Sequence, residues 1–179
     1  MSMKITSFMT QYKFKKTEEE KENMVKSHIK NEYVPFEKKA DVAKAIVDAS
    51  FYHEEIGADG NVHKTFHIDS VAKHMLMCMA VIDLYTDIAR SKGNGKMLED
   101  FNVLNGSGIL DLIIQNINPR ELKEFNMVLQ MVCDDAMSNE YETHAFVSKQ
   151  IERLAELIGN VIVPIVKNLN IDQIKDVAN

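Results

Sequence analysis

The segment over residues 70–91 constrains the fold most, because its apolar side chains are not confined to one face of a helix. One helical face would carry Val71, Met75, Cys78, Met79, Ile82, Tyr85 and Ile88, and Leu76, Met77, Ala80, Val81 and Leu84 widen it nearly all round. A helix that is apolar on most sides has to be covered on most sides. With Asp69 as its N-cap, the sequence predicts a central helix with Met75, Cys78, Met79 and Ile82 inside.

Two helices are predicted before this segment. Thr17 and Glu20 form a capping box, which starts a helix that should run to about Asn31. Pro35 follows it, and the residue before a proline avoids helical dihedral angles. A second helix is predicted from Phe36 to about Phe51, because apolar residues recur there at spacings of three and four.

A change of period marks residues 52–66. Tyr52, Glu54 and Ile56 alternate with their neighbours, and so do Val62, Lys64 and Phe66. The dipeptide Asp59-Gly60 between the two runs is a strong turn signal. The pattern predicts a short β-hairpin, which should lie against the helices because an isolated hairpin is marginally stable.

The rest of the chain is predicted to be helical. A helix is expected at residues 109–117, and another from Asn118 and Pro119 to about Met137, where residues 138–140 should break it. A final long helix, kinked by Pro164, is expected over residues 142–169 with Phe146 and Ile151 inside, before a short helix at 171–177.

These elements predict a mainly α fold: a single-domain helical bundle of about six helices with one short β-hairpin at about residues 52–66. A chain of 179 residues with 45% hydrophobic residues, three prolines and seven glycines fits one globular domain over residues 1–179. Residues 1–16 are predicted to form a loosely packed N-terminal arm. Cys78 and Cys133 are interpreted as buried free thiols in a reducing compartment.

Charge and hydropathy indicate which partners to expect. The only dense basic run, Lys13 to Lys16, is followed by Glu18 to Glu20, so no concentrated basic face for nucleic acid is expected. No stretch approaches 18 uninterrupted apolar residues, and no signal peptide is recognised, so neither a membrane partner nor export is predicted. The expected location is the cytoplasm of the cell that makes the protein.

Few residue patterns carry recognisable chemistry. His63 and His67 are four apart but fall on a predicted strand, where that spacing is about 13 Å, so no metal site is predicted. Asp83 and Asp87 could form a carboxylate pair for acid–base work, but they also fit the polar stripe of the central helix, with an ion pair to Arg90. No catalytic, cofactor or metal site is predicted, although these four residues are the first suspects if the chain is an enzyme.

Several stretches resemble small helical proteins of bacteriophages and prophages of Gram-positive bacteria. They are Tyr-Val-Pro-Phe-Glu-Lys-Lys-Ala-Asp-Val-Ala-Lys-Ala-Ile-Val at residues 33–47, Ile-Asp-Leu-Tyr-Thr-Asp-Ile at 82–88, Leu-Asn-Gly-Ser-Gly-Ile-Leu-Asp at 104–111, and Asp134-Asp135 with Asn139-Glu140. The resemblance carries no catalytic signature and no active residues. It implies a viral protein that acts in an infected bacterium or in the virion.

The function predicted is therefore that of a non-enzymatic bacteriophage protein that works through protein–protein contacts, most simply a structural or assembly component. A host-interaction protein, such as an inhibitor of a bacterial defence system, is the alternative, and an enzyme with no readable motif is a second. The final predicted helix is apolar on more than one side between Leu157 and Val166. Ile162, Ile165 and Val166 are the predicted contact residues, for self-association or for a protein partner. The alternative is that this helix is fully buried, packed by the hairpin and the first two helices.

Overall fold

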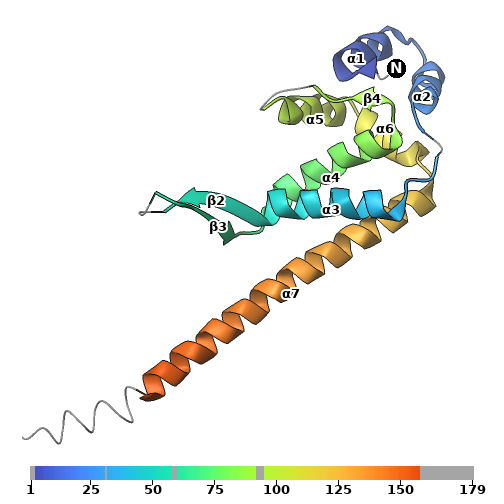
Figure 1. The fold of residues 1–179 in the computed structure, drawn as a ribbon. Helices are drawn as coiled ribbons and strands as arrows, with labels where there is room; N and C mark the ends of the chain where they lie inside the picture. The colour runs from blue at the N-terminus through green and yellow to red at the C-terminus, as the bar shows by residue number, and fades with distance from the viewer. Residues whose placement is uncertain (1–2, 31, 58–59, 92–94, 158–179) are drawn as a thin grey trace, which may run out of the picture. The chain divides into compact units, whose positions relative to one another are not determined.

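The computed structural model describes residues 3–30, 32–57, 60–91 and 95–157, with side chains as far as Glu152. These residues form seven helices and two small two-stranded sheets (Figure 1). The predicted fold class, mainly α with one antiparallel hairpin, is confirmed. Contacts divide the chain into two units, Met1–Asp134 and Asp135–Asn179, so a single domain over residues 1–179 stays a prediction.

The N-terminal segment is folded, contrary to the loosely packed arm predicted for residues 1–16. Strand β1 (Met3–Lys4) leads into helix α1 (Ile5–Phe14), which buries Ile5, Phe8 and Met9. Their spacing of three and four places them on one helical face. Helix α2 (Glu18–Ser27) starts at the predicted capping box, where the Thr17 hydroxyl accepts a hydrogen bond from the backbone N–H of Glu20 at 3.1 Å. It ends four residues before the predicted Asn31.

Helices α3 (Phe36–Phe51) and α4 (Ser70–Tyr85) pack side by side in the first unit (Figure 1). Helix α3 has the predicted bounds. Helix α4 is capped by Asp69 as predicted, and it buries Cys78, Met79 and Ile82, whereas Met75 is only half-buried and Val71 is exposed. Its second half is thus the central part of the core. The prediction that Cys78, Met79 and Ile82 lie inside is therefore confirmed, and the same prediction for Met75 was wrong.

Helix α4 also ends six residues earlier than predicted, at Tyr85. Beyond it the backbone bonds to distant segments: Lys30 N–H donates to the carbonyl of Tyr85, and Asp87 N–H to that of His28. Strand β4 (Ile88–Ala89) then pairs in parallel with β1. Because the Tyr85 carbonyl and the Asp87 N–H have these partners outside the helix, the chain can leave the helix there without leaving them unpaired.

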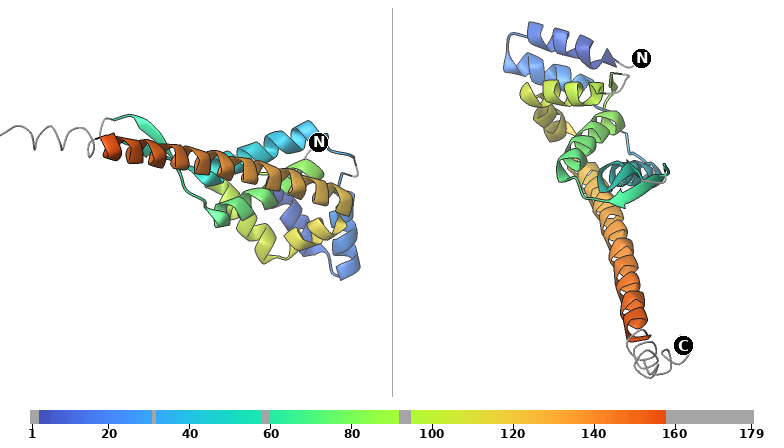
Figure 2. Two further views of the ribbon diagram at one scale, coloured as in Figure 1. Left: turned by 90° about the horizontal axis from the view of Figure 1, so that it is seen from below. Right: turned by 90° about the vertical axis from the view of Figure 1, so that its left-hand side faces the viewer.

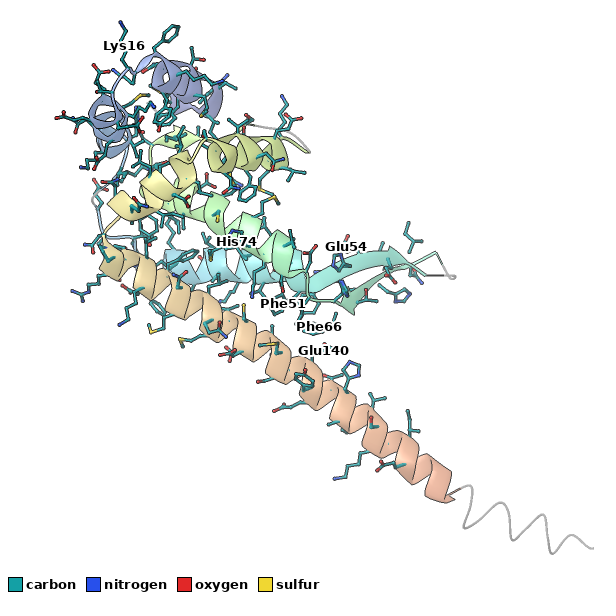
Figure 3. All side chains as sticks on the ribbon, turned by 180° about the vertical axis from the view of Figure 1, so that it is seen from behind. Lys16, Phe51, Glu54, Phe66, His74 and Glu140 are labelled. Atoms are coloured by element: carbon teal, nitrogen blue, oxygen red, sulfur yellow. The ribbon has the colours of Figure 1, made fainter. Side chains whose placement is uncertain are left out.

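The hairpin consists of β2 (Tyr52–Ile56) and β3 (Val62–Phe66), paired antiparallel with Tyr52 opposite Phe66. At its base the rings of Phe51 and Phe66 meet edge to face, 5.9 Å apart (Figure 3). The remaining strand residues are mostly exposed, so the hairpin extends from the ends of α3 and α4, and the prediction that it lies against the helices was wrong beyond its base. Helices α1 and α2 lie at the end of this unit away from the hairpin (Figure 2).

Two short helices complete the cover of α4. Helix α5 (Lys96–Gly106), which the sequence analysis did not identify, buries Leu104, and helix α6 (Ile109–Asn116), close to its predicted bounds, buries Ile109, Leu110 and Ile113. Gly108 between them has a φ of +71°, a left-handed conformation that glycine adopts without steric cost.

Helix α7 (Pro119–Leu157) is one continuous helix of 39 residues. Asn118 accepts a hydrogen bond from Arg120 N–H at its start, as predicted. The predicted break at residues 138–140 does not occur, because Ser, Asn and Glu cost a helix only about 0.5 kcal/mol each and neither Gly nor Pro is present there. None of the helices in the described ranges contains an apolar stretch long enough to span a membrane.

Candidate functional site

The start of α7 is joined to helix α3 by a cluster of four side chains around the buried Lys39, made by Tyr33, Lys39, Glu121 and Glu124. Lys39 Nζ lies 2.8 Å from Glu121 Oε2 and 3.2 Å from Glu124 Oε2, and its side chain has no solvent exposure. The same ammonium group sits 4.6 Å from the centre of the Tyr33 ring, a cation–π distance. Glu121 also accepts a hydrogen bond from the backbone N–H of Val34.

The side chains of the cluster stay charged because each charge is stabilised by a neighbour of opposite sign. Burial disfavours the charged ammonium, but the contacts with Glu121 and Glu124 outweigh it and raise the pKa of Lys39. Burial likewise opposes ionisation of Glu121, but Lys39 and the Val34 N–H outweigh it and lower the pKa of Glu121 below its usual value. All these groups are engaged with one another, so we assign the cluster a structural role.

Beyond Asp134 the character of α7 changes from buried to exposed. In the first unit it buries Phe125, Val128, Leu129 and Cys133. In the second unit every described side chain from residue 138 to residue 152 is exposed or only half-buried. Large apolar side chains are among them: Tyr141 is 73% exposed, Phe146 63%, Val147 46% and Ile151 61%. The prediction that Phe146 and Ile151 lie inside the protein was therefore wrong.

These exposed apolar side chains are the candidate interaction surface. Lone surface hydrophobic residues are ordinary, but several large ones along one stretch of helix are typical of a contact site. The contact residues predicted from the sequence, Ile162, Ile165 and Val166, lie outside the residues that the structure describes.

Asp83 lies beside a pocket of about 210 Å³ between α3 and α4. Its Oδ2 is 2.5 Å from Arg90 Nη2, which confirms the ion pair expected for it. Burial raises the pKa of Asp83, and the guanidinium of Arg90 offsets part of that effect. The pocket wall is otherwise apolar, formed by Val42, Ala45, Ile46, Leu76 and Ala80.

Asp87 does not share that pocket. It follows the end of α4, where its Oδ1 lies 2.7 Å from Nδ1 of His28, a residue that follows α2. The two carboxylates suspected of acid–base chemistry are therefore each paired with a different base, and neither pairing forms the carboxylate dyad considered from the sequence.

The hairpin histidines are on the surface. His63 and His67 are both exposed, and the ring of His67 lies 5.2 Å from that of His53. Among the described residues, no three or more His, Cys, Asp or Glu side chains are grouped so that they could hold a metal ion.

The Lys39 cluster was missed at the sequence level, although a signal for it exists. Lys39 lies four residues before Ala43 and eleven before Ser50, on the same helical stripe as the buried face of α3. A lysine in an apolar stripe requires an anionic partner. The sequence alone does not tell which carboxylate, 82 or more positions away, supplies it.

In comparisons with known proteins, the chain matches no protein-family model, no curated protein and no solved structure.

Proposed function

We propose that this chain is a non-enzymatic bacteriophage protein that acts through protein–protein contacts, as a structural or assembly component. The observation that supports contact formation is the exposure of Tyr141, Phe146, Val147 and Ile151 on one continuous helix. The bacteriophage assignment is supported by the resemblance of residues 33–47, 82–88 and 104–111 to proteins of that source.

The energetics favour a partner for this helix. Burying a side chain such as Phe or Ile is worth about 1.5–3 kcal/mol. Helices in proteins owe most of their stability to packing of an apolar face, because intrinsic propensity alone gives marginal stability. A partner that covers the exposed side chains of residues 141–151 would supply that packing.

A site-specific crosslinker tests the proposal. A photoreactive phenylalanine analogue replaces Phe146 in the full-length protein, which is produced during phage infection. Crosslinks to capsid, tail or scaffold proteins, or to this chain within such assemblies, are expected. The matched control carries the same analogue at Asn23, an exposed position on α2.

Three results would contradict the proposal. Equal crosslinking from positions 146 and 23 would mean that α7 is not a contact surface. Crosslinks to a host defence protein alone would favour the host-interaction alternative. A gene neighbourhood of early anti-host genes instead of capsid and tail genes would point the same way.

A further inference from the structure

We propose that the pocket between α3 and α4 binds a free apolar α-amino acid, with Asp83 and Arg90 holding its two charged groups and the apolar wall holding its side chain. This site goes beyond the protein contacts proposed above and does not depend on them. The proposal is carried by the exposure of the pocket wall, by its single acid–base pair and by its volume.

The pocket opens the core of the first unit beside Asp83. From Cys78 to Thr86 every residue is buried except Asp83, which is half-buried. Apolar residues of the wall also meet water, since Val42 and Leu76 are half-buried and Ala45 is exposed. A ligand that covers them would remove apolar surface from water, which favours binding.

The charged end of the pocket consists of one acid and one base. Asp83 Oδ2 is paired with Arg90 Nη2, and Arg90 Nη1 donates to Met97 Sδ at 3.3 Å. A carboxylate can accept, and a guanidinium can donate, more hydrogen bonds than these. The side chains of Asp83 and Arg90 are 35% and 40% exposed, so a ligand in the pocket can reach both.

The paired charges favour a zwitterion. A ligand with one charge would have to compete with Arg90 for Asp83, or with Asp83 for Arg90. An α-amino acid carries an ammonium and a carboxylate on the same carbon atom, so its charges can lie antiparallel to the Asp83–Arg90 pair without breaking it. Each new contact is then a charge-assisted hydrogen bond. Burial raises the pKa of Asp83, so this partly desolvated carboxylate gains from a second cation.

The volume and the wall define the side chain of the ligand. The pocket has a volume of about 210 Å³, and a cavity of about 150 Å³ holds a benzene molecule. The side chain of leucine is smaller than benzene, so the pocket has room for it and for part of the main-chain atoms. The wall is aliphatic, formed by Val42, Ala45, Ile46, Leu76 and Ala80. Leucine, isoleucine or methionine therefore fits better than a polar amino acid, whose side chain would lose its hydrogen bonds to water.

Isothermal titration calorimetry of the full-length protein with L-leucine tests the proposal. We expect a Kd below about 1 mM, a modest affinity for a ligand of this size. L-Leucinamide lacks the carboxylate, 4-methylpentanoate lacks the ammonium, and L-alanine lacks most of the side chain. Each should bind at least about 10-fold more weakly than L-leucine.

Variants of the protein locate the site. Asp83→Asn and Arg90→Gln should each weaken leucine binding at least about 10-fold, whereas Asp48→Asn, at an exposed position of α3 outside the pocket, should not change it. Ala45→Phe should weaken binding by filling the pocket, and Ala49→Phe, exposed one turn further along α3, is its control. Partly exposed ion pairs contribute little to stability, so the thermal midpoint should show that Asp83→Asn stays folded.

Three results would overturn the proposal. The first is no binding of L-leucine up to about 10 mM. The second is equal binding of L-leucine and either L-leucinamide or 4-methylpentanoate, because one charge would then suffice. The third is an equal loss of binding in each variant and its control. If Asp83→Asn unfolds, Ala45→Phe and Ala49→Phe still decide the matter. None of these results affects the crosslinks expected from position 146, so the proposed function stands or falls separately.

Discussion

Replacement of Lys39 by Met tests whether the Lys39 cluster fixes the start of α7 to α3. Met keeps most of the apolar volume of the lysine stem, so the change removes the charge without opening a large cavity. Glu121, with a side chain only 10% exposed, then lacks its ammonium partner and retains the Val34 N–H at 3.2 Å. Breaking a buried ion pair in this way costs about 3–5 kcal/mol. The whole free energy of unfolding of a typical domain is about 5–15 kcal/mol, so this loss would be a large part of it.

Urea titration followed by circular dichroism measures how far Lys39→Met lowers the free energy of unfolding. With a slope near 2 kcal/mol per molar, the unfolding midpoint should fall by about 2 M. Lys38→Met is the matched control, because Lys38 is the exposed neighbour on the same helix and should change stability by less than about 0.5 kcal/mol. Adding Glu121→Gln to Lys39→Met should recover much of the loss, since the neutral amide can still accept from the Val34 N–H.

The stability of the protein should depend on pH in a way that follows from the lowered pKa of Glu121. Its pKa is lowered in the folded protein from the usual 4.5, so the unfolded state binds the proton more readily. The stabilisation from this carboxylate is therefore complete above pH 4.5 and is lost as the pH falls through the folded pKa. The difference in the free energy of unfolding between the wild type and Lys39→Met should therefore become smaller in acid. The structural role of the cluster would be refuted if Lys39→Met lowered the free energy of unfolding by less than about 1 kcal/mol at pH 7. It would also be refuted if the difference from the wild type were the same at pH 3 as at pH 7.

Three further predictions concern the first unit, and each is checked by thermal or urea unfolding. Gly108→Ala should destabilise the protein by about 1 kcal/mol, because Gly108 has a positive φ. Gly106 is helical and its surroundings are equally open, so Gly106→Ala should leave stability unchanged or raise it. If both variants changed stability in the same direction, φ would not be the cause. Ile82→Ala should cost about 2–5 kcal/mol, and a cost below about 1 kcal/mol would show that the second half of α4 is not core. Chelator treatment should leave the thermal midpoint unchanged, and a drop that zinc reverses would reveal a metal site.

Local signals were enough to identify several elements from the sequence. The capping box placed the start of α2, the apolar stripe gave both ends of α3, and the change to a two-residue period located the hairpin. Asp69 and Asn118 marked two further helix starts. Each of these depends on hydrogen bonds or side-chain spacing within a few residues, which the sequence states directly.

The candidate site was only partly accessible in this way. The sequence indicated apolar residues in excess of a single core face near the end of the chain, but it placed the contact at Ile162, Ile165 and Val166 and assigned Phe146 and Ile151 to the interior. An apolar periodicity shows that a helix face needs cover, and it does not show whether the same chain provides that cover. The exposure of Phe146 and Ile151 is a property of the folded chain.

The sequence by itself determined that the chain is mainly helical, where most helices begin, and that a hairpin interrupts them. Only the tertiary structure decided where α4 ends, that α7 continues past residue 140, and that Lys39 meets Glu121 and Glu124. The physical reason is the range of the interactions involved. Caps and periodicities act within one or two helical turns, whereas the backbone of Tyr85 and the ammonium of Lys39 find partners 55 and 82 positions away, which only the folded chain brings into contact.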